Sequence, residues 1–325
     1  MLEEVERWLT RRSWSVADRP LDRLLAAKAR DPRRGSVSVV LPALNEEATV
    51  GDIVATIRRE LMEKAPLVDE LVVIDSGSTD ATAKAAREAG ARVVHRDEIL
   101  PRMPAVPGKG EVLWRSLLVT SGDIVCFVDA DLRDFSADFV SGIVGPLLTD
   151  PDLRFVKAMY DRPFGDAPGE PGSGGAAGQG GRVTELVARP LLNLHWPRLA
   201  GFVQPLGGEY AARRSLLEQL PFPVGYGVEL GLLVDALHTV GLDALAQVDV
   251  GVRRHRHQDG QALGRMAAAI YRTAQLRLSR GHLVRPELTQ FERGEDGFVP
   301  RTHAVDTEER PPMREIEEYV ARRAA

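Results

Sequence analysis

The segment VCFVDADLRD, residues 125–134, runs from an apolar stretch directly into carboxylates. Its first four residues have the composition of a buried strand, and Asp129, Asp131 and Asp134 follow where that strand should end. Such an end is either an ordinary polar turn or the beginning of a metal site, because carboxylate oxygens are what Mg²⁺ and Mn²⁺ prefer. The function depends on which interpretation holds.

Length and composition exclude several classes of protein. The chain has 325 residues, of which 44% are hydrophobic and 27% charged, and its net charge is −5. These values are typical of a globular protein and argue against general nucleic-acid binding. Cys126 is the only cysteine, so no disulfide forms within the chain, and it should be a small buried side chain. The N-terminus has no apolar signal region, and no apolar run is long enough to span a membrane, so we expect a cytoplasmic protein.

Apolar strand patterns alternate with helical patterns through the first half of the chain. The expected strands are residues 37–41, 69–75, 91–96 and 123–129, and the expected helices include 79–89 and 111–120. This alternation predicts an α/β protein with a Rossmann-like, mainly parallel sheet flanked by helices. Ligands bind beyond the carboxyl ends of such strands. Three of these ends read PALN, DSGS and DAD, which favours a binding site there over plain turns.

The obvious nucleotide-binding motifs are missing. PGKGE, residues 107–111, has a lysine between glycines, but a phosphate-binding P-loop needs Ser or Thr where Gly110 stands. No GxGxxG follows the first strand either. Lys109 is therefore either a solvated turn residue or a cation near a phosphate. A second D-x-D pattern, Asp150-Pro151-Asp152, reads as a turn.

Several blocks in a fixed order carry a resemblance to a known family. They are LPALNEE (41–47), DSGSTD (75–80), PGKGE (107–111), DAD (129–131), GRVTELVARPLL (181–192), QPLGGEYA (204–211), GYGVELGLL (225–233) and GVRRHRH (251–257). Together they resemble the glucosyl-3-phosphoglycerate and mannosyl-3-phosphoglycerate synthases of one bacterial family, which are retaining glycosyltransferases of the GT-A fold. The resemblance covers residues 36–260.

The resemblance implies a domain organisation. Residues 1–35 would be an N-terminal arm, and residues 36–260 the GT-A catalytic domain, with a nucleotide-sugar half at 36–135 and an acceptor half at 150–260. Residues 261–325 would be a helical C-terminal segment with a polar tail. Within the acceptor half, the glycine-rich residues 165–181 are either a flexible linker or a loop over the site.

The resemblance also implies roles for individual residues. The expected nucleotide-sugar ligands are Pro42, Ala43, Leu44, Glu46, Ser76, Lys109, Asp129 and Ala130. Asp131 and His255 would bind Mg²⁺ or Mn²⁺, which acts as a Lewis acid on the departing diphosphate. Without the resemblance, the RRHRH run that contains His255 reads as a solvated cationic face.

The expected acceptor residues are Gly181, Arg182, Thr184 and His257. A glycine-rich loop that enters a helix offers backbone N–H groups to an anion, and an arginine adds a bidentate donor. From the residues alone, the same stretch reads as an ordinary first helical turn. The resemblance implies 3-phosphoglycerate as the acceptor.

Catalysis is expected to involve Glu229, the backbone near Leu206, and Asp131. Glu229 reads either as a first-turn glutamate favoured by the helix dipole or as an active-site carboxylate. The residues show no nucleophile and acid pair of the kind found in retaining glycosidases. The resemblance implies front-side attack, with Glu229 orienting the substrates.

The donor is the least determined part of the prediction. Overall likeness to the mannosyl branch favours GDP-mannose, although GDP-glucose or UDP-glucose remains possible. Relatives that transfer glucose often read D-S-D where this chain has Ala130, which leaves the nucleotide base open. The alternatives are a synthase restricted to UDP-glucose, a sugar-1-phosphate nucleotidyltransferase, and a noncatalytic binding protein. A homodimer is expected, with neither nucleic-acid nor membrane partners.

Overall fold

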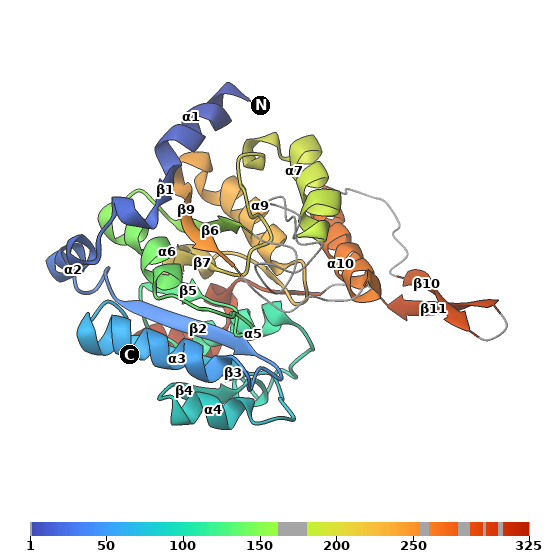
Figure 1. Cartoon of the computed structure of the whole chain (residues 1–325), viewed down its shortest axis with the longest axis horizontal. Helices are drawn as coiled ribbons and strands as arrows, with labels where there is room; N and C mark the ends of the chain where they lie inside the picture. The colour runs from blue at the N-terminus through green and yellow to red at the C-terminus, as the bar shows by residue number, and fades with distance from the viewer. Residues whose placement is uncertain are drawn as a thin grey trace, which may run out of the picture.

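The computed structural model describes residues 2–161, 181–253, 260–278, 287–294, 297–304 and 308–324. A central eight-stranded sheet has the order β1-β9-β6-β7-β5-β2-β3-β4 (Figure 1). Its strands are β1 (Ser13–Ser15), β2 (Val37–Ala43), β3 (Glu70–Asp75), β4 (Arg92–His95), β5 (Ile124–Phe127), β6 (Phe155–Asp161), β7 (Tyr210–Arg213) and β9 (Leu245–Val252). All neighbouring strands are parallel except β7, which runs antiparallel to both β5 and β6.

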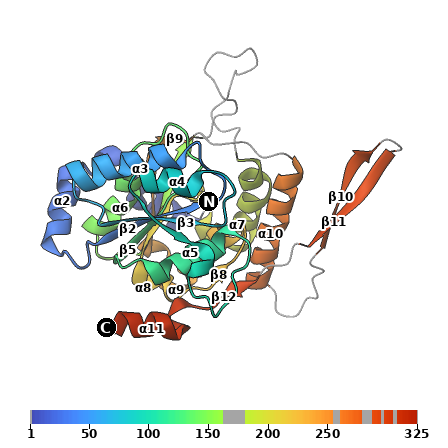
Figure 2. The ribbon, with the colours of Figure 1, turned by 90° about the horizontal axis from the view of Figure 1, so that it is seen from below.

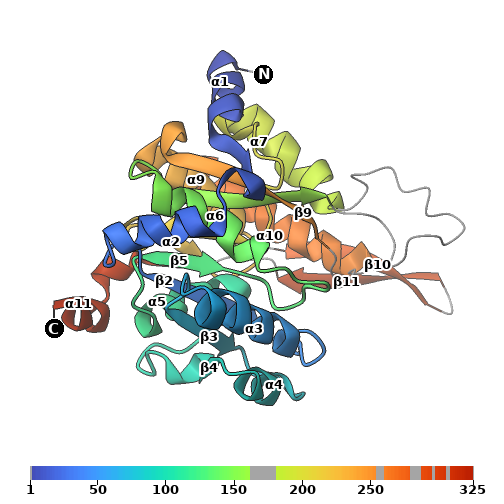
Figure 3. The same cartoon turned by 60° about the vertical axis from the view of Figure 1, so that its left-hand side comes forward.

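Helices cover both faces of this sheet. They are α1 (Glu3–Arg12), α2 (Leu21–Arg30), α3 (Val50–Arg58), α4 (Thr82–Glu88), α5 (Lys109–Val119), α6 (Asp138–Thr149), α7 (Arg189–His195), α8 (Arg214–Leu217), α9 (Val228–Val240), α10 (Gly260–Leu278) and α11 (Glu317–Ala324). Figure 3 shows α2, α3 and α6 in front of the sheet, with α9 and α10 behind it. This is the expected mainly parallel α/β sheet flanked by helices.

The alternation of side chains along a strand divides the core into two layers. On β2, Val39 and Leu41 join the cluster with α3 and α6, whereas Val40 joins the cluster with α5 and α9. Cys126 is fully buried, as its surroundings in the sequence predicted. Because β2, β3 and β5 are buried on both faces, they read as continuous apolar runs, and their bounds match the prediction to within two residues.

The N-terminal arm is part of the sheet. β1 is the edge strand that pairs with β9, and Trp8 on α1 is completely buried. The Trp8 indole N–H donates to the carbonyl of Leu245 at 2.8 Å, and its ring lies 4.7 Å from that of Phe202. The arm therefore closes one edge of the domain.

The C-terminal part contains more than the expected helix. α10 begins at residue 260, and after it β10 (Glu287–Gly294) and β11 (Gly297–Ala304) form an antiparallel hairpin that projects from the body (Figures 1 and 2). The sequence signal for this hairpin was the Asp296-Gly297 dipeptide. Residues 308–324, expected as a polar tail, pack against the body because Met313, Ile316 and Tyr319 form a buried apolar stripe. In the part of the chain that the structure describes, no helix has the length and apolar character needed to cross a membrane.

Replacing Trp8 should show how firmly the arm is joined to the domain. We expect Trp8→Ala to lower the free energy of unfolding by about 3–5 kcal/mol, because it removes a buried aromatic side chain and leaves the Leu245 carbonyl unpaired. Urea unfolding followed by circular dichroism measures this change. Trp14→Ala is the matched control, since Trp14 is only partly buried. Equal losses in the two variants would contradict the assignment.

Candidate active site

A cavity of about 890 Å³ lies at the carboxyl ends of β2, β3 and β5. Every expected site residue within the described part of the chain lines it: Pro42, Ala43, Leu44, Glu46, Ser76, Lys109, Asp129, Ala130, Asp131, Gly181, Arg182, Thr184, Leu206 and Glu229. His255 and His257 lie outside the described residues. The cavity thus joins the predicted nucleotide-sugar residues to the predicted acceptor residues, although their individual roles stay predictions.

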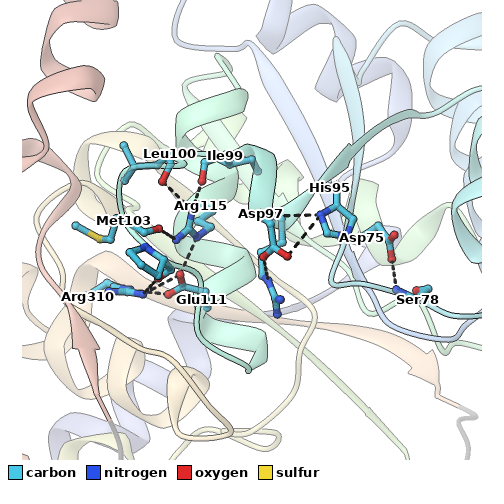
Figure 4. Close-up of polar contacts among 12 residues, drawn as sticks. Asp75, Ser78, His95, Asp97, Ile99, Leu100, Met103, Glu111, Arg115 and Arg310 are labelled. Carbon is cyan, nitrogen blue, oxygen red and sulfur yellow. Dashed lines mark hydrogen bonds and ion pairs between the residues drawn. The ribbon is translucent and has the colours of Figure 1, made fainter.

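Two turns at the ends of β2 and β3 form one wall of the cavity. The backbone N–H of Ser76 donates to the carbonyl of Ala43 at 2.9 Å, and that of Glu46 donates to the Thr82 hydroxyl at 2.7 Å. Within the second turn, the Asp75 carboxylate accepts from the N–H of Ser78 at 3.0 Å (Figure 4). These bonds hold the PALN and DSGS turns together.

Lys109 lines the cavity and contacts two of its carboxylates. Its ammonium group contacts a carboxylate oxygen of Asp129 and lies 2.8 Å from one of Glu229, and its side chain is 22% exposed. Burial acts to lower the pKa of Lys109, but the neighbouring carboxylates raise it well above the usual value. Lys109 is therefore a charged bridge between the D-x-D end of β5 and α9, and the alternative of a solvated turn lysine is wrong.

Arg253 is the most important residue that the sequence did not single out. Its side chain is 3% exposed and its guanidinium joins three carboxylates: Glu209 at 2.9 Å, Asp129 at 2.8 Å and Asp131 at 3.3 Å. Tyr160 donates to the other oxygen of Glu209 at 2.7 Å. Arg253 belongs to the GVRRHRH block, in which the two histidines were the expected site residues and no local pattern marks the arginine as buried.

Burial disfavours the charged forms of both Arg253 and Asp131. It tends to lower the pKa of Arg253, yet the carboxylates around it, Glu209 first, raise that pKa well above its usual value. Burial also raises the pKa of Asp131, and Arg253 opposes this effect. The guanidinium therefore keeps the carboxylates close together at the end of β5.

The carboxylates fit a hard divalent cation in their chemistry. Among the described residues, no group of three or more His, Cys, Asp or Glu side chains could hold a metal ion by itself. Asp131 would hold the ion, with Asp129 beside it, and further ligands would come from a substrate diphosphate. The other expected ligand, His255, belongs to residues 254–259, which the structure does not describe.

The QPLGGE loop, residues 204–209, brings backbone close to these charges. A side chain on Gly208 would overlap both the Asp129 carboxylate and the Lys109 ammonium, so a larger residue there would have to displace both groups. The ammonium of Lys157 donates to the carbonyl of Gly207 at 2.7 Å. Lys157 is buried, and burial lowers its pKa to about 8. No sequence pattern indicated a role for this lysine, because it lies inside β6.

The residues expected to bind the acceptor lie at the start of a helical segment. Gly181 has a φ of +87°, and its carbonyl accepts from the N–H of Glu185 at 3.1 Å. Thr184 is buried, and with Arg182 it lines the cavity. The cavity lining also includes residues that were not expected as site residues, from α10 and from turns: Arg96, Gly108, Tyr226, Leu263, Met266 and Ile270.

A mainly parallel sheet whose strand ends carry paired carboxylates beside a cavity of this size is the arrangement expected of a glycosyltransferase of the GT-A fold. In agreement, the family model for glycosyl transferase family 2 matches residues 38–156. Over 314 residues the chain is 51% identical to the glucosyl-3-phosphoglycerate synthase of Mycolicibacterium smegmatis, covering 94% of this chain and 97% of the relative. The chain belongs to the family of glucosyl-3-phosphoglycerate and mannosyl-3-phosphoglycerate synthases, and it is a hexosyltransferase.

Two solved structures are similar along almost the whole chain. Glucosyl-3-phosphoglycerate synthase from Mycobacterium tuberculosis, in complex with Mn²⁺, UDP-glucose and phosphoglyceric acid, has a TM-score of 0.79 and 47% identity, covering 91% of this chain and 94% of that one. Mannosyl-3-phosphoglycerate synthase from Rubrobacter xylanophilus has a TM-score of 0.86 and 39% identity, covering 96% and 98%. The M. tuberculosis enzyme was also solved with Mg²⁺ and UDP. These complexes confirm the expected use of Mg²⁺ or Mn²⁺ in this family.

The expected preference for GDP-mannose finds no support in these comparisons. Sequence identity is 51% to a glucosyl synthase and 39% to the mannosyl synthase. Ala130, which lies between the two aspartates, is almost fully buried and lines the cavity, but its methyl group has no polar atom with which to read a base. The prediction of mannose rests on overall likeness to the mannosyl branch of the family, and such likeness is a poor guide to the configuration of a single sugar hydroxyl.

Gly208→Ala tests the close approach of the loop to Asp129 and Lys109. We expect hexosyl transfer to fall by at least about 10²-fold, because the added methyl group must displace both charged groups. Steady-state kinetics with thermal melting measures this effect. Gly225→Ala is the control in the same cavity, since a side chain at Gly225 meets nothing within 4 Å. Wild-type kinetics in Gly208→Ala would contradict the proposed close approach.

The low pKa of Lys157 predicts a pH dependence of stability. Between pH 8 and 10.5 Lys157 is more often protonated in the unfolded chain than in the native protein. The free energy of unfolding therefore increases as the pH rises through this interval. We expect the wild type to gain about 1.4 kcal/mol per pH unit over this interval relative to Lys157→Met. The other ionisable groups are common to both proteins, so the difference between the two isolates the contribution of Lys157. Urea unfolding of the two proteins on either side of pH 8 gives the difference, and a flat or falling difference would refute the prediction.

Proposed function

We propose that this protein transfers glucose from UDP-glucose to 3-phosphoglycerate with retention of anomeric configuration, with Mg²⁺ or Mn²⁺ bound. The products are glucosyl-3-phosphoglycerate and UDP. The observation that carries this proposal is the single cavity in which the PALN and D-x-D residues face Arg182 and Thr184. The donor and the acceptor can therefore meet in one site, as group transfer requires.

The donor half of the cavity suits a sugar nucleotide. Ser76 and the turn at residues 42–46 offer polar and apolar surface to the nucleoside, and Lys109 provides a cation that is already held in place. A bound divalent metal supplies positive charge to the departing diphosphate. Arg253 orients Asp129 and Asp131 for this task through its contacts with both carboxylates.

The acceptor half suits a small anion. Arg182 supplies a guanidinium for the phosphate or carboxylate of 3-phosphoglycerate, and Thr184 supplies a hydroxyl beside it. The N–H groups at the start of the helical segment add the positive end of the backbone dipoles. The free hydroxyl of the acceptor then faces the sugar on the donor side.

Retention follows from attack on the same face as the leaving group. The acceptor hydroxyl forms the new bond to the anomeric carbon, the bond to the diphosphate breaks, and the departing diphosphate takes the hydroxyl proton. Glu229 is fixed at 2.8 Å from Lys109, so it serves to orient the substrates, and the backbone near Leu206 supports the anomeric centre. Glu229 thus needs no covalent role.

Mannosyl transfer from GDP-mannose is the second candidate. It is kept because the fold is similar to that of the R. xylanophilus mannosyl synthase, with a TM-score of 0.86 over 96% of the chain, although this likeness does not favour mannose over glucose. The family assignment leaves no support for a sugar-1-phosphate nucleotidyltransferase. A homodimer remains a prediction, which light scattering on the purified protein can test.

A product assay tests the reaction and the donor together. Purified protein with Mn²⁺ and 3-phosphoglycerate should convert UDP-glucose to a phosphorylated glucosyl-glycerate, with kcat/KM at least about tenfold above that for GDP-mannose. Mass spectrometry and NMR of the product give its identity and anomeric configuration. Preference for GDP-mannose would replace the first candidate by the second, and an inverted product would refute front-side attack.

Asp131→Asn tests the metal ligand, and Asp134→Asn is its matched control in the same loop. We expect the first substitution to reduce transfer by about 10²-fold or more and to raise the Mn²⁺ concentration needed for activity, because it removes a ligand charge. The second should change transfer by less than about threefold, since Asp134 is exposed and does not line the cavity. Full activity of Asp131→Asn at low Mn²⁺ would show that Asp131 is no ligand.

A further inference from the structure

Residues 308–324, which the sequence presented as a polar tail, lie behind the active-site cavity. Here β12 (Glu309–Arg310) pairs antiparallel with β8 (Phe222–Pro223), and the segment continues into α11 (Figure 2). No residue of this segment lines the cavity. The segment nevertheless contacts two turns that contribute residues to opposite sides of the cavity. They are the PGKGE turn at 107–111 and the FPVGYG turn at 222–227.

Arg310 forms a buried ion pair with the first of these turns. Its guanidinium lies 2.6 and 3.0 Å from the two carboxylate oxygens of Glu111, whose side chain is fully buried (Figure 4). Glu111 also accepts from Arg115 at 2.7 Å, and Arg310 donates to the carbonyl of Pro104 at 3.0 Å. A fully buried carboxylate that contacts two guanidinium groups is held in one position, because separating the groups would leave buried charges unpaired.

The backbone joins the same three segments in one chain of hydrogen bonds. The N–H of Glu111 donates to the carbonyl of Val224 at 3.1 Å, and the N–H of Val224 donates to the carbonyl of Glu308 at 3.0 Å. The turns are in close contact, since a side chain on Gly110 would overlap the carbonyl of Pro223. Arg277 on α10 holds Glu309 at 2.8 Å from the other side.

Each turn places a charged group in the donor site. Lys109 comes two residues before Glu111, and Glu229 comes five residues after Val224. These two side chains meet at 2.8 Å across the cavity. The relative position of the turns therefore fixes the relative position of Lys109 and Glu229.

We propose that Arg310 is a positioning residue for the donor site, and that residues 308–324 brace the two turns from outside the cavity. The ion pair with Glu111 holds the PGKGE turn against Val224. It thereby keeps the Lys109 ammonium in contact with the carboxylates of Asp129 and Glu229. The segment acts on the sugar nucleotide without touching it. This inference rests on the proposed function, because it assigns the donor to the part of the cavity that Lys109 lines.

The test compares Arg310→Met with Arg310→Lys and with Glu318→Ala in the full-length protein. Glu318 is the matched control: it lies in the same segment, is exposed, and pairs only with the exposed Arg102 among the contacts described. Kinetics with UDP-glucose and 3-phosphoglycerate, and calorimetric titration with UDP and Mn²⁺, are measured well below the melting temperature of every variant. Thermal melting separates lost stability from lost positioning.

We expect Arg310→Met to raise both the KM for UDP-glucose and the Kd for UDP by about tenfold and to lower kcat, while the KM for 3-phosphoglycerate changes by less than about twofold. Arg310→Lys should recover part of the loss, and Glu318→Ala should match the wild type. A merely structural role would lower the melting temperature and leave these constants unchanged in the folded protein.

The inference is overturned if folded Arg310→Met has wild-type constants for the donor, or if donor and acceptor constants deteriorate equally. Should Arg310→Met fail to fold, Arg310→Gln decides, because its amide N–H can still donate to Glu111, whose charge stays paired with Arg115. A wild type that binds UDP but forms no product refutes the proposed reaction, and the UDP affinities then decide the inference. A wild type that does not bind UDP refutes both.

Discussion

The buried guanidinium of Arg253 is the interaction on which the active site depends. Carboxylates at the end of β5 and on the neighbouring loop would repel one another in a site shielded from water. Arg253 follows directly after β9 and contacts Glu209, Asp129 and Asp131, so it joins three segments that are far apart in the sequence. Breaking such a contact leaves buried charges without a partner, which costs about 3–5 kcal/mol. The geometry of the D-x-D pair is therefore inseparable from the packing of the acceptor half.

The antiparallel strand β7 explains why a loop from the second half of the chain reaches this pair. β7 lies between β5 and β6 and runs against both, so the residues just before it arrive at the carboxyl end of β5. The QPLGGE loop thereby comes beside Asp129 and Lys109, where Gly208 leaves room for the contact. A parallel strand in the same place would have delivered this loop to the opposite edge of the sheet.

The strands and much of the cavity wall could be predicted from local sequence, because β2, β3 and β5 are apolar runs that end in polar turns. The PALN, DSGS and DAD ends converge as parallel topology requires. Other parts could not be predicted, because they depend on contacts between distant residues. Arg310 pairs with Glu111, which lies 199 residues earlier in the chain. Nothing in the local sequence distinguishes Lys157, whose hydrogen bond to the carbonyl of Gly207 depends on its burial in β6. Residues 308–324 looked polar because their apolar stripe is sparse.

The charges at the cavity centre indicate why a divalent cation belongs to this site. Among the described residues, the carboxylates of Asp129 and Asp131 lie together at the end of β5 and share the guanidinium of Arg253 with Glu209. A nucleoside diphosphate is itself an anion and would be repelled by these carboxylates, most strongly where water is excluded. A divalent cation beside them would be shared by the protein and the diphosphate. Donor and metal should consequently bind with strong mutual dependence, each providing the charge that the other requires.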